Sequence, residues 1–112
     1  IAIKLQNGQN TIYGRAKAWG LTGDHEEIVF SLEDINTSDT SRDYIFYTSS
    51  VFYRIDNDSI LTIYAPESSI SEPSRVVTKM PINIQPFASE DELTADTLKF
   101  RKLGLKTLSI YP

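Results

Sequence analysis

The sequence predicts a mainly β protein: an antiparallel β-sandwich of about seven or eight strands, with one short C-terminal helix over about residues 90–103 before the last strand. Residues 43–65 carry apolar side chains at consecutive positions, so the strands that they form should be buried on both faces. Elsewhere apolar and polar side chains alternate, and turn-forming residues separate the alternating segments. The 112 residues fit a single domain, 1–112, without an internal repeat.

The N-terminal third predicts strands over residues 1–5, 11–19 and 26–33. Asn7-Gly8 suits the tight turn of a hairpin between the first two, because both types tolerate a positive φ. A register for the second and third strands brings an opposite-charge pair together and lets an aromatic ring cover a strand glycine. Its predicted cross-strand pairs are Trp19 with His25, Lys17 with Glu27, and Gly14 with Phe30.

The middle of the chain predicts a polar loop, exposed and mobile, over residues 34–43, and then strands over 44–48, 51–56 and 59–65. Asn57-Asp58 suits a two-residue turn between the last two of these strands. That turn would pair Phe52 with Ile63 on one face and Ile55 with Ile60 on the other.

Proline shapes the segment that follows. Pro66 and Pro73 enclose a serine-rich connector that cannot form an interior strand, since proline has no amide hydrogen to donate. Pro81 and Pro86 place the alternating residues 75–87 at a sheet edge.

A helix is then expected to begin at Ser89. Ser89 would cap it with Glu92 three residues on, and Gly104 would end it. Acidic residues at its start and basic residues at its end suit the helix dipole. A last strand is expected over residues 105–111.

Composition narrows the classes of function. Fifteen acidic and eleven basic residues give a net charge of −4, which disfavours nucleic acid and anionic membranes as partners. The absence of cysteine excludes disulfides, a thiol nucleophile and thiolate metal ligands. No apolar run is long enough to cross a bilayer. The chain begins at Ile1, inside an expected strand, so we expect that N-terminal residues of the full chain precede it.

Two groups of residues could carry chemistry but have more ordinary explanations. His25 lies beside Asp24, Glu26 and Glu27, yet the motifs of a nucleophile elbow and of a zinc protease are both missing. Glu26 and Glu27, as neighbours on a strand, point to opposite faces and cannot act on one bond. Oxygen-bearing residues in the 34–43 loop could surround a cation, but their spacing matches no EF-hand, and no metal site is predicted; they are Asp34, Asn36, Ser38, Asp39 and Asp43.

Three further positions are noted. Arg54 lies on an otherwise apolar face, where it could mark an anion site or simply lay its stem over the core. Asn36 and Asn57 each begin a match to the glycosylation pattern, which is expected by chance in a chain rich in serine and threonine.

One aromatic and basic stripe on the second strand is the predicted binding site. It consists of Tyr13, Arg15, Lys17 and Trp19, whose rings could stack on a sugar or a peptide side chain while the cations fix hydroxyls or carboxylates. The alternative is structural: Lys17 has Glu27 as an expected partner, and Trp19 would be covered by other elements.

The expected function is therefore that of a non-catalytic binding or interaction module of an extracytoplasmic, bacterial protein, located in the periplasm, on the cell surface or outside the cell. Its partner would be a carbohydrate, a peptide or a protein, and no cofactor is expected. One alternative is a hydrolytic enzyme or accessory domain with a carboxylate and histidine site near residues 24–27. Another is a structural domain that pairs through an edge strand, over residues 1–5 or 105–111.

Overall fold

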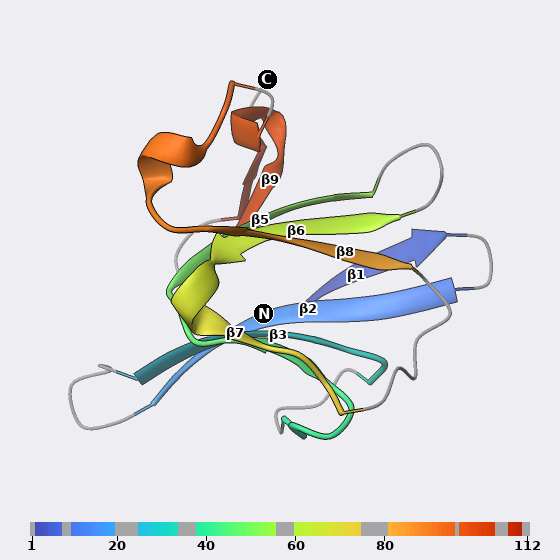
Figure 1. The fold of residues 1–112 in the computed structure, drawn as a ribbon. Helices are drawn as coiled ribbons and strands as arrows, with labels where there is room; N and C mark the ends of the chain where they lie inside the picture. Colours follow the sequence, from blue (N-terminus) through green and yellow to red (C-terminus); the bar gives the residue numbers. More distant parts are fainter. Residues whose placement is uncertain are drawn as a thin grey trace.

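The computed structural model describes residues 2–7, 10–19, 25–33, 38–55, 60–74, 81–95, 97–104 and 108–110. Over these residues the protein is mainly β, with ten strands in two sheets of five strands each (Figure 1). The order of the first sheet is β1 (Ala2–Asn7), β2 (Asn10–Trp19), β3 (His25–Ser31), β4 (Tyr44–Phe46) and β7 (Ile70–Ser71). The order of the second sheet is β10 (Leu108–Ile110), β9 (Arg101–Gly104), β5 (Ser50–Ile55), β6 (Leu61–Pro66) and β8 (Ile82–Phe87).

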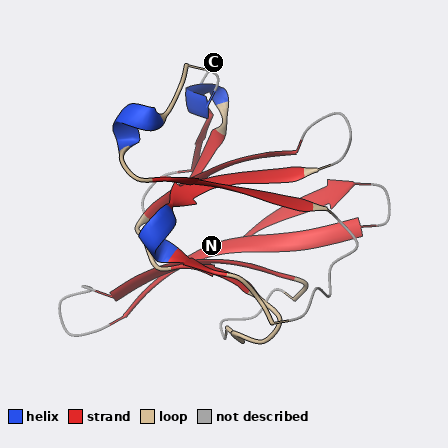
Figure 2. Ribbon diagram, viewed as in Figure 1, coloured by secondary structure: helices blue, strands red, loops and turns tan. Residues whose placement is uncertain are grey.

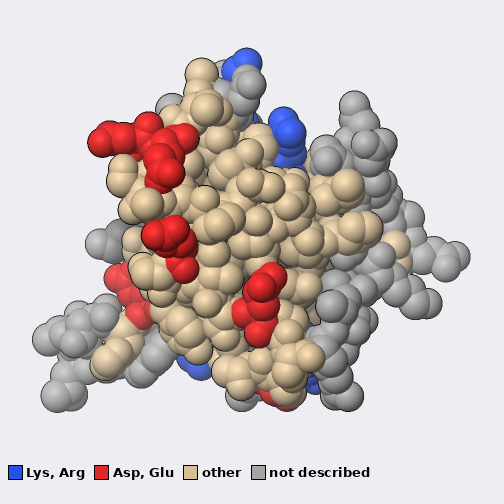
Figure 3. Space-filling model, in the orientation of Figure 1, with Lys and Arg blue, Asp and Glu red and all other residues tan. Residues whose placement is uncertain are grey.

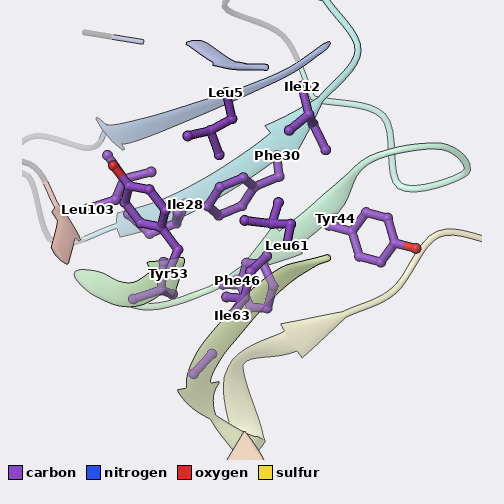
Figure 4. Packing of buried hydrophobic residues seen from close by; sticks show 12 residues of the cluster. Leu5, Ile12, Ile28, Phe30, Tyr44, Phe46, Tyr53, Leu61, Ile63 and Leu103 are labelled. Atoms are coloured by element: carbon purple, nitrogen blue, oxygen red, sulfur yellow. The ribbon is translucent and has the colours of Figure 1, made fainter. Parts of the chain in front are cut away.

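The two sheets form separate layers in Figure 1, and one apolar core lies between them. Phe30 of the first sheet is fully buried and meets Tyr53 of the second sheet edge to face, with the ring centroids 6.1 Å apart. Phe30 also meets Phe46 at 6.1 Å within its own sheet. Figure 4 shows how these side chains fill the interior; the full core cluster is Leu5, Ile12, Ile28, Phe30, Tyr44, Phe46, Val51, Tyr53, Leu61, Ile63, Ala65 and Leu103.

The hairpin register predicted for β2 and β3 is confirmed. Its three predicted pairs, Trp19 with His25, Lys17 with Glu27, and Gly14 with Phe30, are all observed. Gly14 is needed at its position because a Cβ atom there would lie 2.9 Å from Phe30 Cε2. The Phe30 ring occupies the space that the missing side chain leaves.

The prediction that the middle strands are buried on both faces is also confirmed. In β5, Tyr53 points into the core, while its neighbour Phe52 is buried on the opposite face. These strands do not all belong to one sheet, however. β4 pairs with β3 and β7 in the first sheet, and the chain then crosses to the second sheet before β5 begins.

The register predicted for β5 and β6 is wrong by one residue. Phe52 lies opposite Tyr64, not Ile63, and Ile55 lies opposite Leu61, not Ile60. Each strand already had apolar residues on both faces, so the pattern alone could not distinguish two registers that differ by one residue.

The sheets are not wholly antiparallel, because β8 runs parallel to β6. A parallel pair needs a long connection, and here the chain passes through η1 (Glu67–Ser69) and β7 of the other sheet before it returns. β8 lies at the sheet edge, as its prolines predict.

The C-terminal helix predicted over about residues 90–103 is not formed. Two single 3-10 turns, η2 (Glu90–Glu92) and η3 (Thr97–Lys99), precede β9 in its place (Figure 2). The predicted cap exists, since Ser89 Oγ accepts the Asp91 N–H at 3.1 Å and Glu92 Oε2 accepts the Ser89 N–H at 2.9 Å. The cap starts a single turn and not a helix. The residues near the end of the predicted helix form β9 instead, in which Leu103 lies in the core opposite Val51 of β5.

Candidate functional site

A cavity of about 370 Å³ opens between the two sheets, where β1 faces the end of β5 and the start of β9. We call this cavity the basic groove. Three consecutive residues from each of three segments line it: Lys4, Leu5, Gln6, Tyr53, Arg54, Ile55, Lys99, Phe100 and Arg101. The β5–β9 ladder ends at the pair of Tyr53 and Arg101, so the chain before Arg101 turns away from β5 and leaves the groove open.

Basic residues are frequent in the lining of the basic groove. Four of the eleven basic residues of the chain line it, namely Lys4, Arg54, Lys99 and Arg101, and its described lining contains no aspartate or glutamate. The chain as a whole has a net charge of −4, and acidic side chains are prominent on the face drawn in Figure 3. The positive groove is therefore a local feature that opposes the overall charge.

The aromatic side chains around the groove hold one of these cations in place. The Arg54 guanidinium carbon lies 4.2 Å from the centre of the Phe100 ring. Phe100 is 4% exposed and meets Tyr64 edge to face at 5.1 Å. A cation over an aromatic face gains about 0.5–1 kcal/mol at an exposed site.

Tyr53 places a polar atom at the base of the groove. Its side chain is 2% exposed, and in Figure 4 its hydroxyl end lies at the margin of the core cluster. The hydroxyl has no hydrogen-bond partner among the described residues, which is unusual for a buried polar group. Burial raises the pKa of Tyr53, and the nearby guanidinium group of Arg101 offsets part of that rise.

This arrangement can bind an anion that also has an apolar or extended part. The guanidinium and ammonium groups supply charge, Tyr53 supplies a buried donor, and Leu5, Ile55 and Phe100 supply apolar contact. Within the described part of the chain, no group of three or more His, Cys, Asp or Glu residues could hold a metal ion. The described residues also contain no helix that is long and apolar enough to span a membrane.

The predicted aromatic and basic stripe lies on the face of β2 that points away from the core. Tyr13 and Lys17 are half-buried there, and Lys17 lies opposite Glu27. Arg15 is only 4% exposed, and its Nη1 donates to Ser31 Oγ at 2.9 Å and to the Glu33 carbonyl oxygen at 3.3 Å. Structural contacts thus engage Arg15, while the side chain of Trp19 lies outside the described residues.

The residues proposed for hydrolysis do not converge. His25 is exposed at the start of β3. Glu27 is buried and accepts a hydrogen bond from Ser38 Oγ at 3.2 Å, while Glu26 points to the other face of the strand. Asp24 lies outside the described residues.

The acidic loop is only partly described, since Asp34 and Asn36, like Asn57, lie outside the described residues. The expectation of an exposed loop is wrong for Asp43, which is 1% exposed. Asp43 Oδ2 accepts the Asp39 N–H at 2.9 Å, and Oδ1 lies 3.6 Å from Arg42 Nε. Asp39 Oδ1 accepts the N–H and the hydroxyl of Ser41 at 2.8 and 2.6 Å. These carboxylates therefore hold a turn together.

Sequence reasoning found one residue of the basic groove and missed the others. Arg54 was noted as a possible anion ligand, because a cation on an apolar face is uncommon. Lys99 and Arg101 were assigned to the end of a helix, so their positions in space were wrong. Lys4 is an exposed residue on an edge strand, and only the packing of the sheets brings it near the others.

Comparison with known proteins gives no relative for this chain. No protein-family model, curated protein or solved structure matches it. The functional argument therefore rests on the chemistry of the groove.

Proposed function

We propose that this protein is a non-catalytic β-sandwich module that binds a negatively charged ligand in the basic groove. The single observation that carries the proposal is that Lys4, Arg54, Lys99 and Arg101 all line one cavity in a chain of net charge −4. Acidic carbohydrates and acidic peptides are the matching ligand classes. We retain the extracytoplasmic, bacterial setting as part of the proposal, and fractionation of the source cells tests it.

Three properties of the groove support binding rather than catalysis. Its volume lies near the lower end of the range of about 300–1,000 Å³ that is usual for ligand sites. Its lining combines charge with apolar surface, as ligand sites do. The described lining offers Tyr53, Gln6 and cations but no carboxylate or imidazole that could act as a general base.

Amide chemical shifts measured by NMR during titration with anions test the proposal. The probes are sulfate, succinate, glucuronate and hexaglutamate, with glucose and hexalysine as uncharged and cationic controls. At least one anion should shift the amides around the groove, from Lys4 to Gln6 and from Tyr53 to Ile55. Added salt should weaken the binding, because charge drives it. The proposal fails if no anion of the panel shifts these amides.

Arg101 and Lys102 offer a matched pair of variants, since they are neighbours on β9. Arg101 lines the groove, whereas Lys102 lies on the other face of the strand with its Nζ 5.9 Å from the centre of the Phe52 ring. Arg101→Gln should weaken anion binding by about ten-fold, and Lys102→Gln should change it little. Equal effects would mean that the anion responds to overall charge and not to the groove.

Pairing through an edge strand is a second candidate function. β1 and β10 each lie at the edge of a sheet, as this function requires. Light scattering at high protein concentration tests pairing between copies: dimers that a charge change at Lys4 disrupts would support it, and monomers alone would contradict it. The residues that the structure describes, which leave out Asp24, offer no observation that favours the hydrolytic alternative.

A further inference from the structure

The basic groove follows the edges of strands. Side chains on a strand alternate between its two faces, so a cavity against one face meets every second residue. Here three consecutive residues line each wall, including Lys4, Leu5 and Gln6 of β1. The cavity therefore runs along the margin of these strands, where the main chain is accessible, and not only over one face.

Main-chain groups are available along this margin. β1 lies at the edge of the first sheet and pairs there with β2, over six residue pairs from Ala2 to Asn7. In an edge strand, every second residue directs its N–H and C=O away from the pairing partner. On the opposite wall, β5 continues to Ile55 after its ladder with β9 ends at Tyr53.

We propose that the basic groove binds an acidic peptide segment in an extended conformation, which adds to β1 as a further strand. This inference rests on the proposed function and specifies its ligand. Main-chain hydrogen bonds to β1 supply affinity, and carboxylates at alternate positions of the segment meet the basic side chains. The Tyr53 hydroxyl, which lies close to Arg101 at the base of the groove, donates to one of these carboxylates.

The spacing of charge favours an extended peptide over a compact anion. The four basic residues of the lining come from three separate segments and not from one turn or loop. An extended chain rises about 3.3 Å per residue and repeats its side-chain direction about every 7 Å, so several carboxylates can reach several cations at once. A single small anion could satisfy only part of this set.

A single-stranded nucleic acid is the competing polyanion. It has no N–H groups in its backbone to pair with a strand edge, and it binds mainly through charge and through exposed aromatic rings. Phe100 is buried and its ring is covered by Arg54, so it offers no free face on which a base could stack. These contacts favour the peptide.

Strand addition can be separated from simple charge attraction with N-methylated peptides. The probes are hexaglutamate, a version N-methylated at alternate residues and a version N-methylated at every residue. The alternately methylated version can still direct its free N–H groups at β1 and should bind almost as well as hexaglutamate, whereas the fully methylated version keeps the charges but has no N–H group to donate and should bind about ten-fold or more weakly. Amides of β1 should shift and become protected from exchange with solvent in the complex.

Other outcomes have defined meanings. Equal binding of both methylated versions would overturn strand addition and leave the proposed function intact. Strand addition would also be overturned, with the proposed function intact, if succinate bound as tightly as hexaglutamate or if an oligothymidylate bound more tightly than hexaglutamate. If hexaglutamate and every small anion fail to bind, both the inference and the proposed function are wrong.

Discussion

Gly14→Ala is expected to destabilise the protein by about 1–2 kcal/mol, because the core has no room for the added methyl group. A Cβ atom at Gly14 would lie 2.9 Å from Phe30 Cε2, 3.1 Å from Ile3 Cγ1 and 3.1 Å from Leu103 Cδ2. The Leu103 contact involves the end of a flexible side chain, and Ile3 is only partly buried, so it has room to shift. The Phe30 contact is the decisive one.

Phe30 cannot move away without loss. It is fully buried and makes edge-to-face contacts with Phe46 and Tyr53, both with centroids 6.1 Å apart. Overpacking of this kind costs about 1–3 kcal/mol, whereas alanine in place of a strand glycine gains about 0.4–1 kcal/mol from the unfolded state. The difference gives the expected net destabilisation.

Urea unfolding followed by far-ultraviolet circular dichroism measures this effect. Phe30→Leu provides the matched background, since it removes the ring that the new methyl group would meet. In the Phe30→Leu protein, Gly14→Ala should lower the free energy of unfolding by less than in the parent protein, or should raise it. The two changes should therefore differ from additivity by about 1 kcal/mol or more. If Gly14→Ala stabilises the parent protein by about 0.4–1 kcal/mol, the packing described around Phe30 is wrong.

Further predictions concern buried polar groups. Tyr53→Phe should stabilise the ligand-free protein by about 1 kcal/mol, because it removes a buried hydroxyl without a described partner. The same variant should bind anions more weakly. A loss of stability in urea unfolding would contradict the expected stabilisation. Burial raises the pKa of Tyr44, with a further contribution from Glu72, and burial also raises that of Tyr53, both above the unfolded value of 10.0. Stability from these groups is therefore fully present below pH 10 and decreases as pH rises above it, and a Tyr44→Phe/Tyr53→Phe variant should lose less stability over that range. Asp43→Ala should cost about 1–3 kcal/mol, because the Asp39 N–H loses its acceptor; a change near zero in the same urea assay would show that this turn contributes no stability.

Alternation of apolar and polar side chains was sufficient to predict the pairing of two strands where the alternation was regular. In β2 and β3 one face is apolar and the other carries Lys17 and Glu27. Shifting the pairing of these strands by one residue would separate Lys17 from Glu27 and Gly14 from the Phe30 ring. The register could therefore be derived from local pattern. In β5 and β6 both faces are apolar, so the same reasoning gave a register that was wrong by one residue.

The basic groove could not be derived in the same way. Arg54 is far in sequence from Lys4 and from Arg101, and nothing local requires these residues to meet. Their meeting depends on the packing of β1 over the end of β5 and on the β5–β9 ladder ending at Tyr53. Assigning residues 90–103 to a helix hid this ladder, because capping residues can start a single turn as well as a helix.

The sequence by itself determined the β class, the burial of the middle strands on both faces and the β2–β3 register, since each follows from side chains that are neighbours along the chain or directly across one hairpin. Only the tertiary structure decided which sheet β4 joins, that β8 runs parallel to β6, and that four basic residues line one cavity. These outcomes depend on contacts between segments far apart in the chain. Such contacts form because two sheets must bury one common core, and no local pattern encodes that requirement.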